Sequence, residues 1–114
     1  MTAPVSAASA EHYRWGAASE GWHLLQRDDL SIIQESVPAG EAEVRHYHQR
    51  ARQFFFILEG QGTMLLADEE IWLEQGCGLE IPPGVPHQFC NRSDHEVHFL
   101  VISMPRSHGD RINS

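Results

Sequence analysis

Short runs of apolar residues recur along this chain, separated by stretches rich in Gly, Pro, Asn, Asp and Ser. Within several runs, apolar and polar positions alternate with a period of two residues, which is typical of a half-buried β-strand. No apolar pattern with the helical period extends beyond two turns. The pattern predicts an all-β chain with strands at residues 22–25, 30–37, 43–48, 53–58, 63–67, 70–73, 79–81, 86–90 and 97–103.

The strand at residues 53–58 differs from the others because both of its faces are largely apolar. Its two faces carry Gln53, Phe55 and Ile57 on one side and Phe54, Phe56 and Leu58 on the other. If Gln53 faces the interior, the aromatic residues on the opposite face need a second sheet or a second subunit to cover them. We therefore expect a homodimer, since two-fold pairing is the commonest arrangement of soluble oligomers.

Histidines supply the candidate chemistry. His46 and His48 are two residues apart on a predicted strand, so both imidazoles point to the same face. Gln53 opens the next strand, and His87 follows the turn sequence Pro-Pro-Gly-Val-Pro. A lone histidine in a strand is more often structural or solvated, so the pair by itself is a weak indication. Imidazole suits Zn, Cu, Fe and Ni, and an amide oxygen completes such a set, so we interpret these four residues as one metal site.

Glycines and prolines surround these side chains at characteristic spacings. The first block runs Gly40, five residues, His46, one residue, His48, four residues, Gln53, six residues, Gly60. The second runs Gly76, five residues, Pro82, one residue, Gly84, two residues, His87, three residues, Asn91. The two blocks resemble the two motifs of the cupin family, with one departure: Gln53 stands where the family usually has Glu. The resemblance implies a small, RmlC-like jelly-roll β-barrel that holds one divalent metal ion and a small-molecule ligand.

The exchange of Glu for Gln53 changes the expected charge of the site. Three neutral imidazoles and a neutral amide leave a divalent ion with its full charge, which favours anionic ligands. The set suits Ni, Fe, Mn, Co or Zn, and the sequence leaves that choice open. An amide does not titrate usefully, so any general base must come from elsewhere: Glu35, Tyr47, His98 or a bound hydroxide.

Arginines flank the predicted ligands. Strand alternation points Arg45 and Arg52 out of the barrel, whereas Arg50 lies in a turn and is free to reach either way. Surface charge is one interpretation of all three, and a carboxylate clamp at the barrel mouth is the other.

Length and composition predict one domain. We expect a mobile segment at residues 1–11, the barrel at residues 12–105 and a tail at residues 106–114, which either stays free or covers a barrel end. A formal charge of −8 argues against nucleic acid as a partner, and no apolar run is long enough to span a membrane. No signal peptide is evident, and Cys77 and Cys90 match no metal or redox motif, so we expect unpaired thiols and a cytoplasmic location.

Three functions from different classes remain open. The first is a metal-dependent isomerase or lyase that uses the ion as a Lewis acid on a small anionic molecule such as a sugar acid. The ligand set is similar to that of small cupins that convert unsaturated uronates. The second is an Fe(II)-dependent dioxygenase, and the third is a binding module without catalysis. The sequence does not identify the substrate.

Overall fold

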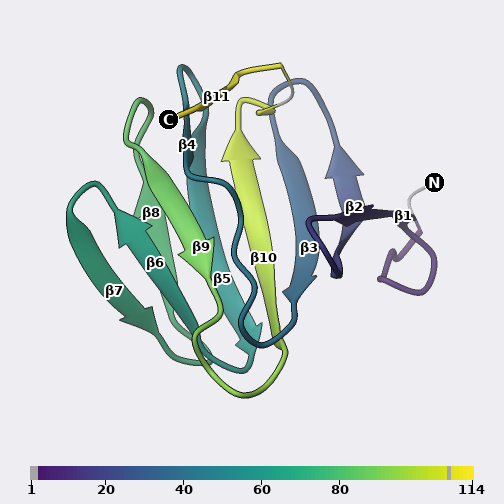
Figure 1. The fold of residues 1–114 in the computed structure, drawn as a ribbon. Coiled ribbons are helices and arrows are strands. Elements are labelled where there is room, and N and C mark those ends of the chain that lie inside the picture. Colours follow the sequence, from purple (N-terminus) through teal and green to yellow (C-terminus); the bar gives the residue numbers. More distant parts are fainter. Residues whose placement is uncertain (1–2, 108) are drawn as a thin grey trace.

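The computed structural model describes residues 3–107 and 109–114. Met1, Thr2 and His108 belong to the predicted segments 1–11 and 106–114 and lie outside the described residues. Two antiparallel sheets pack face to face (Figure 1). The six-stranded sheet has the order β1-β2-β3-β10-β5-β8, and the five-stranded sheet has the order β11-β4-β9-β6-β7. The strands are β1 Glu11–Trp15, β2 Ser19–Gln26, β3 Ser31–Val37, β4 His46–His48, β5 Arg52–Glu59, β6 Gly62–Leu66, β7 Glu69–Leu73, β8 Gly78–Ile81, β9 His87–Cys90, β10 Val97–Met104 and β11 Arg111–Asn113. The described residues contain no helix, and therefore none that is long and apolar enough to cross a membrane.

Alternation along the central strands builds the core. On β5 and β10, every second side chain points between the sheets. Phe55 stacks on Phe99 with ring centroids 5.8 Å apart, and Phe89 of the opposite sheet lies 4.2 Å from Phe99. The buried cluster comprises Val37, Phe55, Ile57, Met64, Leu73, Ile81, Phe89, Val97, Phe99 and Val101. The predicted all-β jelly-roll fold is confirmed.

The expected strand at residues 43–48 is shorter than predicted, because the chain leaves the strand conformation before His46. The Glu43 N–H donates to the Phe89 carbonyl at 3.0 Å, but the Phe89 N–H donates to the Glu43 carboxylate at 3.1 Å. A side chain thus takes the place of a backbone acceptor, and the regular ladder is interrupted. As a result, strand alternation cannot be extended from His46 back to Glu43.

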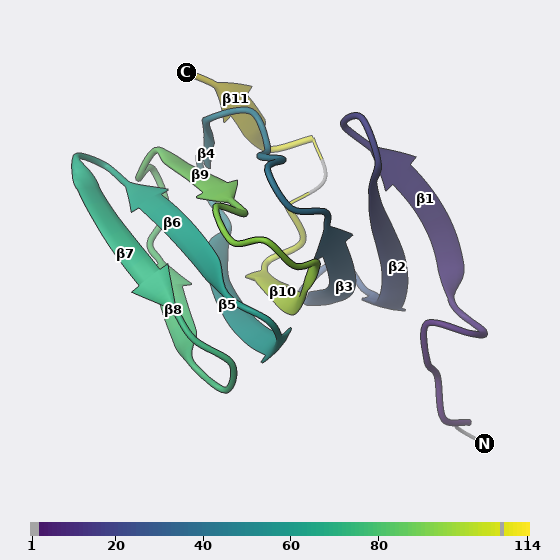
Figure 2. The same ribbon diagram turned by 60° about the horizontal axis from the view of Figure 1, so that its bottom comes forward.

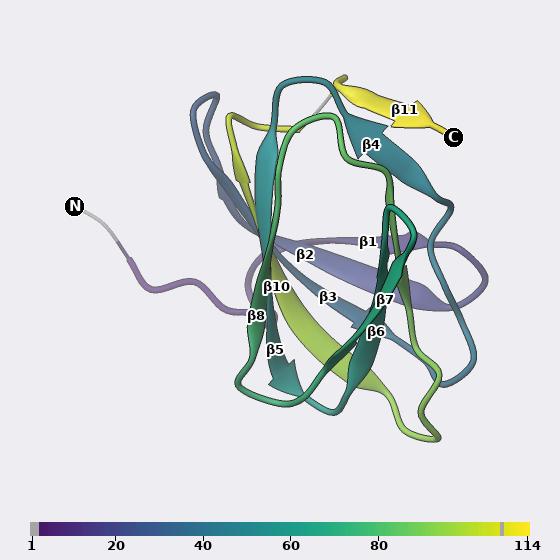
Figure 3. The same cartoon turned by 90° about the vertical axis from the view of Figure 1, so that its left-hand side faces the viewer.

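Two strands were not predicted from the sequence. β1 pairs with β2 in a hairpin, and Figure 2 shows this hairpin at the opposite end of the molecule from β6 and β7. β11 pairs with β4 at the rim, where Figure 3 shows the two strands side by side. The tail at residues 106–114 therefore contributes an edge strand to the sheet that carries the histidine pair.

Candidate metal centre

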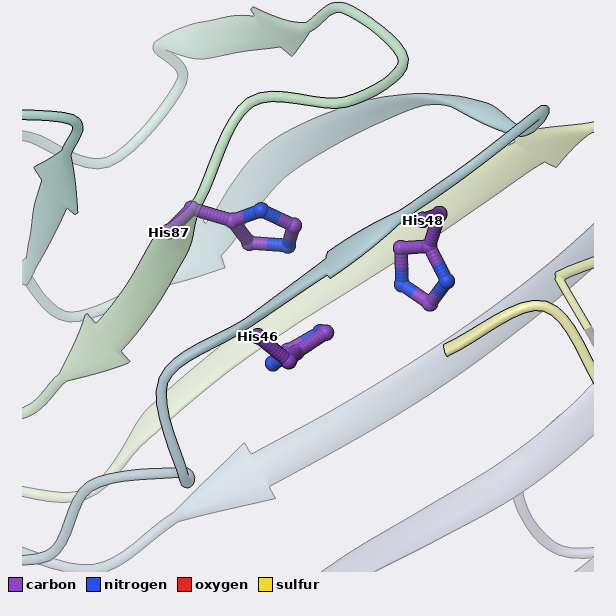
Figure 4. A group of neighbouring side chains, drawn as sticks. All are labelled: His46, His48 and His87. Carbon is purple, nitrogen blue, oxygen red and sulfur yellow. The ribbon is translucent and has the colours of Figure 1, made fainter. Parts of the chain in front are cut away.

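Three histidines from neighbouring strands meet between the two sheets. His46 and His48 project from β4, and His87 of β9 is the register partner of His46. One nitrogen from each ring lies within 4.8 Å of the others. The His46 and His87 rings are closest, with centroids 4.4 Å apart, and Figure 4 shows the three rings facing a common space.

Backbone carbonyls orient two of the rings. The Nδ1–H of His46 donates to the Val44 carbonyl at 2.7 Å, and the Nδ1–H of His87 donates to the Val85 carbonyl at 3.0 Å. In both cases the acceptor lies two residues before the histidine. Since a carbonyl only accepts, each ring carries its proton on Nδ1 and presents the lone pair of Nε2. The loops that enter β4 and β9 therefore fix the tautomers that a metal ion requires.

Burial keeps these imidazoles neutral. His46, His48 and His87 are 3%, 6% and 0% exposed. Removal from water lowers the pKa of His46 to about 3 and that of His48 to about 4, and it also lowers the pKa of His87. At neutral pH all three rings offer lone pairs rather than positive charges.

Gln53 faces the same cavity from β5 of the opposite sheet. Its Nε2–H donates to the Ser103 hydroxyl at 3.0 Å, which turns the amide so that Oε1 has no hydrogen-bond partner. The structure thus brings the three histidines into a tight cluster, and His46, His48 and Gln53 line one cavity. Their binding of a metal ion stays a prediction.

Several buried polar atoms at this site have no hydrogen-bond partner. Three buried polar side-chain atoms of the described residues have no hydrogen-bond partner: His48 Nδ1, Gln53 Oε1 and His87 Nε2. Leaving a buried polar atom unpaired costs about 1–3 kcal/mol, so three at one site are unusual. Two imidazole nitrogens and an amide oxygen, next to a third imidazole, are a donor set that fits a divalent transition metal ion.

A cavity of about 270 Å³ extends from the histidines. His46, His48 and Gln53 line one end, and apolar side chains such as Phe55, Ile33 and Val101 line its walls. Polar side chains of a different kind line the remainder, namely Tyr13, Glu35, Glu43 and Arg111. The cavity therefore joins the histidine cluster to a group of acids, a phenol and a guanidinium.

The two carboxyl groups in this cavity have unusual acidities. Burial raises the pKa of Glu35 to about 7, although the Tyr13 hydroxyl and Arg111 act in the opposite direction. Burial and the neighbouring Glu35 raise the pKa of Glu43 to about 8. Both groups are therefore partly protonated near neutral pH. Perturbed carboxyl groups in a cavity are typical of functional sites.

The structure separates the candidate bases. Glu35 lines the cavity. The sequence did not decide whether its face of the strand points inward, and the structure shows that it does. Tyr47 pairs with Ile112 on β11 and does not line the cavity. The His98 ring bonds to the Glu96 carboxylate at 2.7 Å, also outside the cavity.

None of the three arginines proposed as a clamp lines the cavity. Arg45 donates to the Ala67 carbonyl, Arg52 pairs with Glu80, and the side chain of Arg50 is 77% exposed. The arginine that does line the cavity is Arg111 of β11. Its Nη2–H donates to the Val44 carbonyl at 3.2 Å, which holds the guanidinium beside the loop that leads to His46.

Sequence reasoning missed Tyr13, Glu43 and Arg111 as cavity residues. Strand alternation places Glu43 on the face opposite His46 and His48, and only the interruption before His46 turns it inward. Tyr13 and Arg111 lie on the two strands with no clear alternating pattern in the sequence. The acidic and aromatic character of residues 11–15 was the only signal that could have pointed to Tyr13.

Comparison with known families matches the cupin domain model to residues 33–103. This span contains all four predicted ligands and most of the core. The chain belongs to the cupin family. The resemblance drawn from the two motif blocks is thereby confirmed.

Two relatives show how far the similarity reaches. An uncharacterised protein of Methanocaldococcus jannaschii is 33% identical over 81 residues, which cover 70% of this chain and 65% of that protein. Quercetin 2,3-dioxygenase of Bacillus subtilis is 34% identical over 74 residues, which cover 65% of this chain and 22% of the enzyme. The cupin thus spans under two thirds of the first relative and a small part of the second.

Solved structures share the fold. The polyketide cyclase RemF of Streptomyces resistomycificus has a TM-score of 0.83 and 20% identity, with 99% of this chain and 85% of that one covered. KdgF from a Halomonas species has a TM-score of 0.78 and 17% identity, with 84% and 88% covered. At these identities the comparison concerns the fold alone.

Proposed function

We propose that this cupin binds one divalent transition metal ion through His46, His48, Gln53 and His87, and that it is an enzyme of the isomerase or lyase type. The substrate is a small oxygenated anion such as a sugar acid. The observation that carries the proposal is the cluster of three buried histidines beside a cavity, together with donor atoms of His48, His87 and Gln53 that have no hydrogen-bond partner. When bound, such an ion supplies a Lewis acid that polarises a carbonyl or carboxylate oxygen.

The residues around the cavity favour a ligand with a negative charge. Gln53 is neutral, so the proposed ligand set does not reduce the charge of the ion. Arg111 adds a guanidinium to the cavity wall, and such a group pairs well with a carboxylate. The raised pKa values of Glu35 and Glu43 reduce the repulsion that these carboxyl groups exert on an anion near neutral pH.

One relative favours a second candidate function. The 34% identity to a quercetin dioxygenase supports an O₂-dependent reaction with Fe(II) at the same site. Anaerobic assays separate the two functions, because Lewis-acid isomerisation needs no O₂. A protein that binds metal and ligand but converts no substrate would instead be a binding module.

Metal content tests the site directly. We expect protein purified without added metal to hold about one ion per chain, and His87→Ala to lose most of it because the variant lacks a ligand. Elemental analysis of both proteins measures the difference. His95→Ala is the matched control, since the side chain of His95 is 77% exposed and lies outside the cavity. Equal metal content in the wild type and His87→Ala would contradict the assignment.

A further inference from the structure

A row of four residues crosses the six-stranded sheet at the far end of the cavity. The strand register places Tyr13 of β1 opposite Gly21 of β2, Gly21 opposite Glu35 of β3, and Glu35 opposite Phe99 of β10. Tyr13 and Glu35 are therefore separated by one strand, and a glycine occupies the position between them. Both line the cavity that contains the histidines.

The absence of a side chain at Gly21 is what allows Tyr13 to reach Glu35. A Cβ atom on Gly21 would lie 2.2 Å from Cζ of Tyr13, closer than atoms approach one another in proteins. The phenol ring therefore lies across β2, and its hydroxyl donates to Oε2 of Glu35 at 2.9 Å. The His23 ring packs against the ring of Tyr13 with centroids 4.8 Å apart. These contacts hold the Glu35 carboxyl in one orientation.

This pair lies beside the cavity and outside the apolar core. Neither Tyr13 nor Glu35 belongs to the apolar core cluster. A partly buried carboxyl group, fixed by a phenol and directed into a cavity, is costly unless the cavity uses it. Gln53, which is 5% exposed and whose Oε1 has no hydrogen-bond partner, lines the same cavity. A ligand that contacts Gln53 and the histidines therefore shares this space with Glu35.

We propose that Glu35 is the catalytic residue that takes a proton from the substrate and returns it, and that Tyr13 is the residue that positions Glu35. The proposal rests on the metal-dependent function stated above. It deepens that function by assigning the substrate class, which is an α-hydroxycarbonyl compound with an acidic group. Gln53 cannot serve as the base, so a separate carboxyl group on β3 of the same sheet supplies what the ligand set lacks.

The proton transfer balances without an oxidant or a further reactant. The Glu35 carboxylate accepts the proton from the carbon next to the carbonyl group, and the electron pair of the broken C–H bond moves into that carbonyl group. The hydroxyl proton of the first carbon passes to the former carbonyl oxygen, and the Glu35 carboxylic acid returns its proton to the former carbonyl carbon, so that the hydroxyl and carbonyl groups exchange places. Tyr13 donates its hydrogen bond throughout and transfers no proton.

The surroundings of Glu35 suit this role. Tyr13 faces it from β1, Glu43 and Arg111 face it across the cavity, and His46 and His48 lie at the other end. Burial raises the pKa of Glu35 to about 7, and Tyr13 and Arg111 keep it from rising further. A carboxyl group with a pKa near the working pH both accepts and donates protons efficiently.

Hydrogen exchange on small probes tests the assignment. The probes are hydroxypyruvate and D-glucuronate, each incubated in D₂O with the metal-loaded protein and followed by proton NMR at the carbon next to the carbonyl. We expect Glu35→Gln to slow the exchange by about 100-fold or more and to keep its metal. Glu35→Asp should retain part of the rate. Glu59→Gln is the control, since Glu59 is exposed at the end of β5 and outside the cavity.

A second measurement needs neither metal nor substrate. In metal-free protein with ¹³C-labelled glutamate carboxyl groups, the signal that Glu35→Gln removes should titrate near neutral pH. Tyr13→Phe should raise the pKa of Glu35, because it removes a hydrogen bond that stabilises the charged carboxylate. An unchanged pKa would show that the Tyr13 hydroxyl does not act on Glu35.

Each outcome of these two experiments either supports or overturns the role proposed for Glu35. Equal exchange rates for the wild type and Glu35→Gln overturn the proposal, as does a wild type that holds its metal but exchanges none of the probes. A wild type that holds no metal contradicts the proposed function instead. In that case the carboxyl titration tests the role of Glu35 independently of the metal. Titration at about 7 that shifts in Tyr13→Phe supports the role, whereas titration at the ordinary value of a glutamate overturns it.

Discussion

Gln53 shows how one side chain sets the character of the candidate metal centre. The Ser103 hydroxyl accepts the Nε2–H of Gln53, and the Oε1 atom has no hydrogen-bond partner. A hydroxyl group both donates and accepts, so Ser103 can also serve a carboxylate at this position. Ser103 can therefore pair with either Gln or Glu, and Gln in place of the family's usual Glu removes one negative charge from the proposed ligand set.

At this scale we predict that Gln53→Glu binds divalent metal more tightly, by roughly 10-fold or more, because a carboxylate adds a full negative charge next to the ion. The same variant should bind small carboxylates more weakly, since the net charge at the site falls. Competition with a chelator measures the first effect, and calorimetry with acetate or glycolate measures the second. Gln75→Glu is the control, because it makes the same change of charge at an exposed turn outside the cavity.

Unchanged metal affinity in Gln53→Glu would indicate that the three histidines bind the ion without Gln53. A crystal structure with metal settles the matter geometrically. An amide oxygen at about 2.0–2.4 Å from the ion supports ligation, and a separation beyond about 3 Å leaves a three-histidine site and favours the O₂-dependent alternative.

Among the elements, the strands nearest the two chain ends complete the cavity. β1 brings Tyr13, and β11 brings Arg111. β11 is short, and it is held in place by Asp110, whose carboxylate accepts the N–H groups of Arg50 and Ala51 at 2.9 Å each. The turn between β4 and β5 is thereby joined to the segment that carries Arg111. A single buried carboxylate secures the rim above the histidines.

We predict that Asp110→Ala lowers the free energy of unfolding by about 1–3 kcal/mol, because the buried N–H of Ala51 and the part-buried N–H of Arg50 lose their acceptor. Urea denaturation measures this loss. The variant should also weaken binding of small carboxylates, since Arg111 loses its fixed position. Asp94→Ala serves as the control, since 92% of the Asp94 side chain is exposed. A stability equal to that of the wild type would show that Asp110 does not secure the rim.

On the scale of the whole molecule, the outer face of the six-stranded sheet is the surface that stands out. The register places Ile102 of β10 between Ile32 of β3 and Phe54 of β5, and Leu100 beside Phe56. Phe54 and Leu58 are 40% and 38% exposed. Apolar side chains from three adjacent strands thus form a continuous outer surface. Such a surface is typical of a subunit interface, so we propose that two copies of this cupin pair through it.

The prediction is that the protein sediments with the mass of two chains at micromolar concentration and that Phe54→Asp sediments as one chain, because a buried carboxylate in the interface has no partner. Circular dichroism confirms that the variant is folded. Trp72→Asp should remain dimeric, since Trp72 is 53% exposed but lies on β7 of the other sheet. A wild type that sediments with the mass of one chain would exclude the dimer.

The two-residue period of the strands by itself determined which side chains of β4 and β5 face the interior. Alternation places Gln53 and Phe55 on the interior face of β5 and leaves Phe54 outside, as the structure shows. The same rule places His46 and His48 on one face of β4. These features depend only on neighbours in the chain, because a strand fixes the direction of each side chain from that of the one before it. His87 was placed beside them by the spacing of the glycines and prolines, through the family resemblance.

Only the tertiary structure decided which other groups share the cavity with the histidines. Glu43 turns inward because its carboxylate replaces a backbone acceptor for Phe89. Tyr13 reaches Glu35 because Gly21 lies between them in the register, and Arg111 arrives through pairing of β11 with a strand more than sixty residues earlier. Such contacts join residues far apart in the sequence, and each results from strand pairing rather than from any local pattern. The histidine pair was therefore readable from the chain, whereas the acid, the phenol and the guanidinium around it are products of the fold.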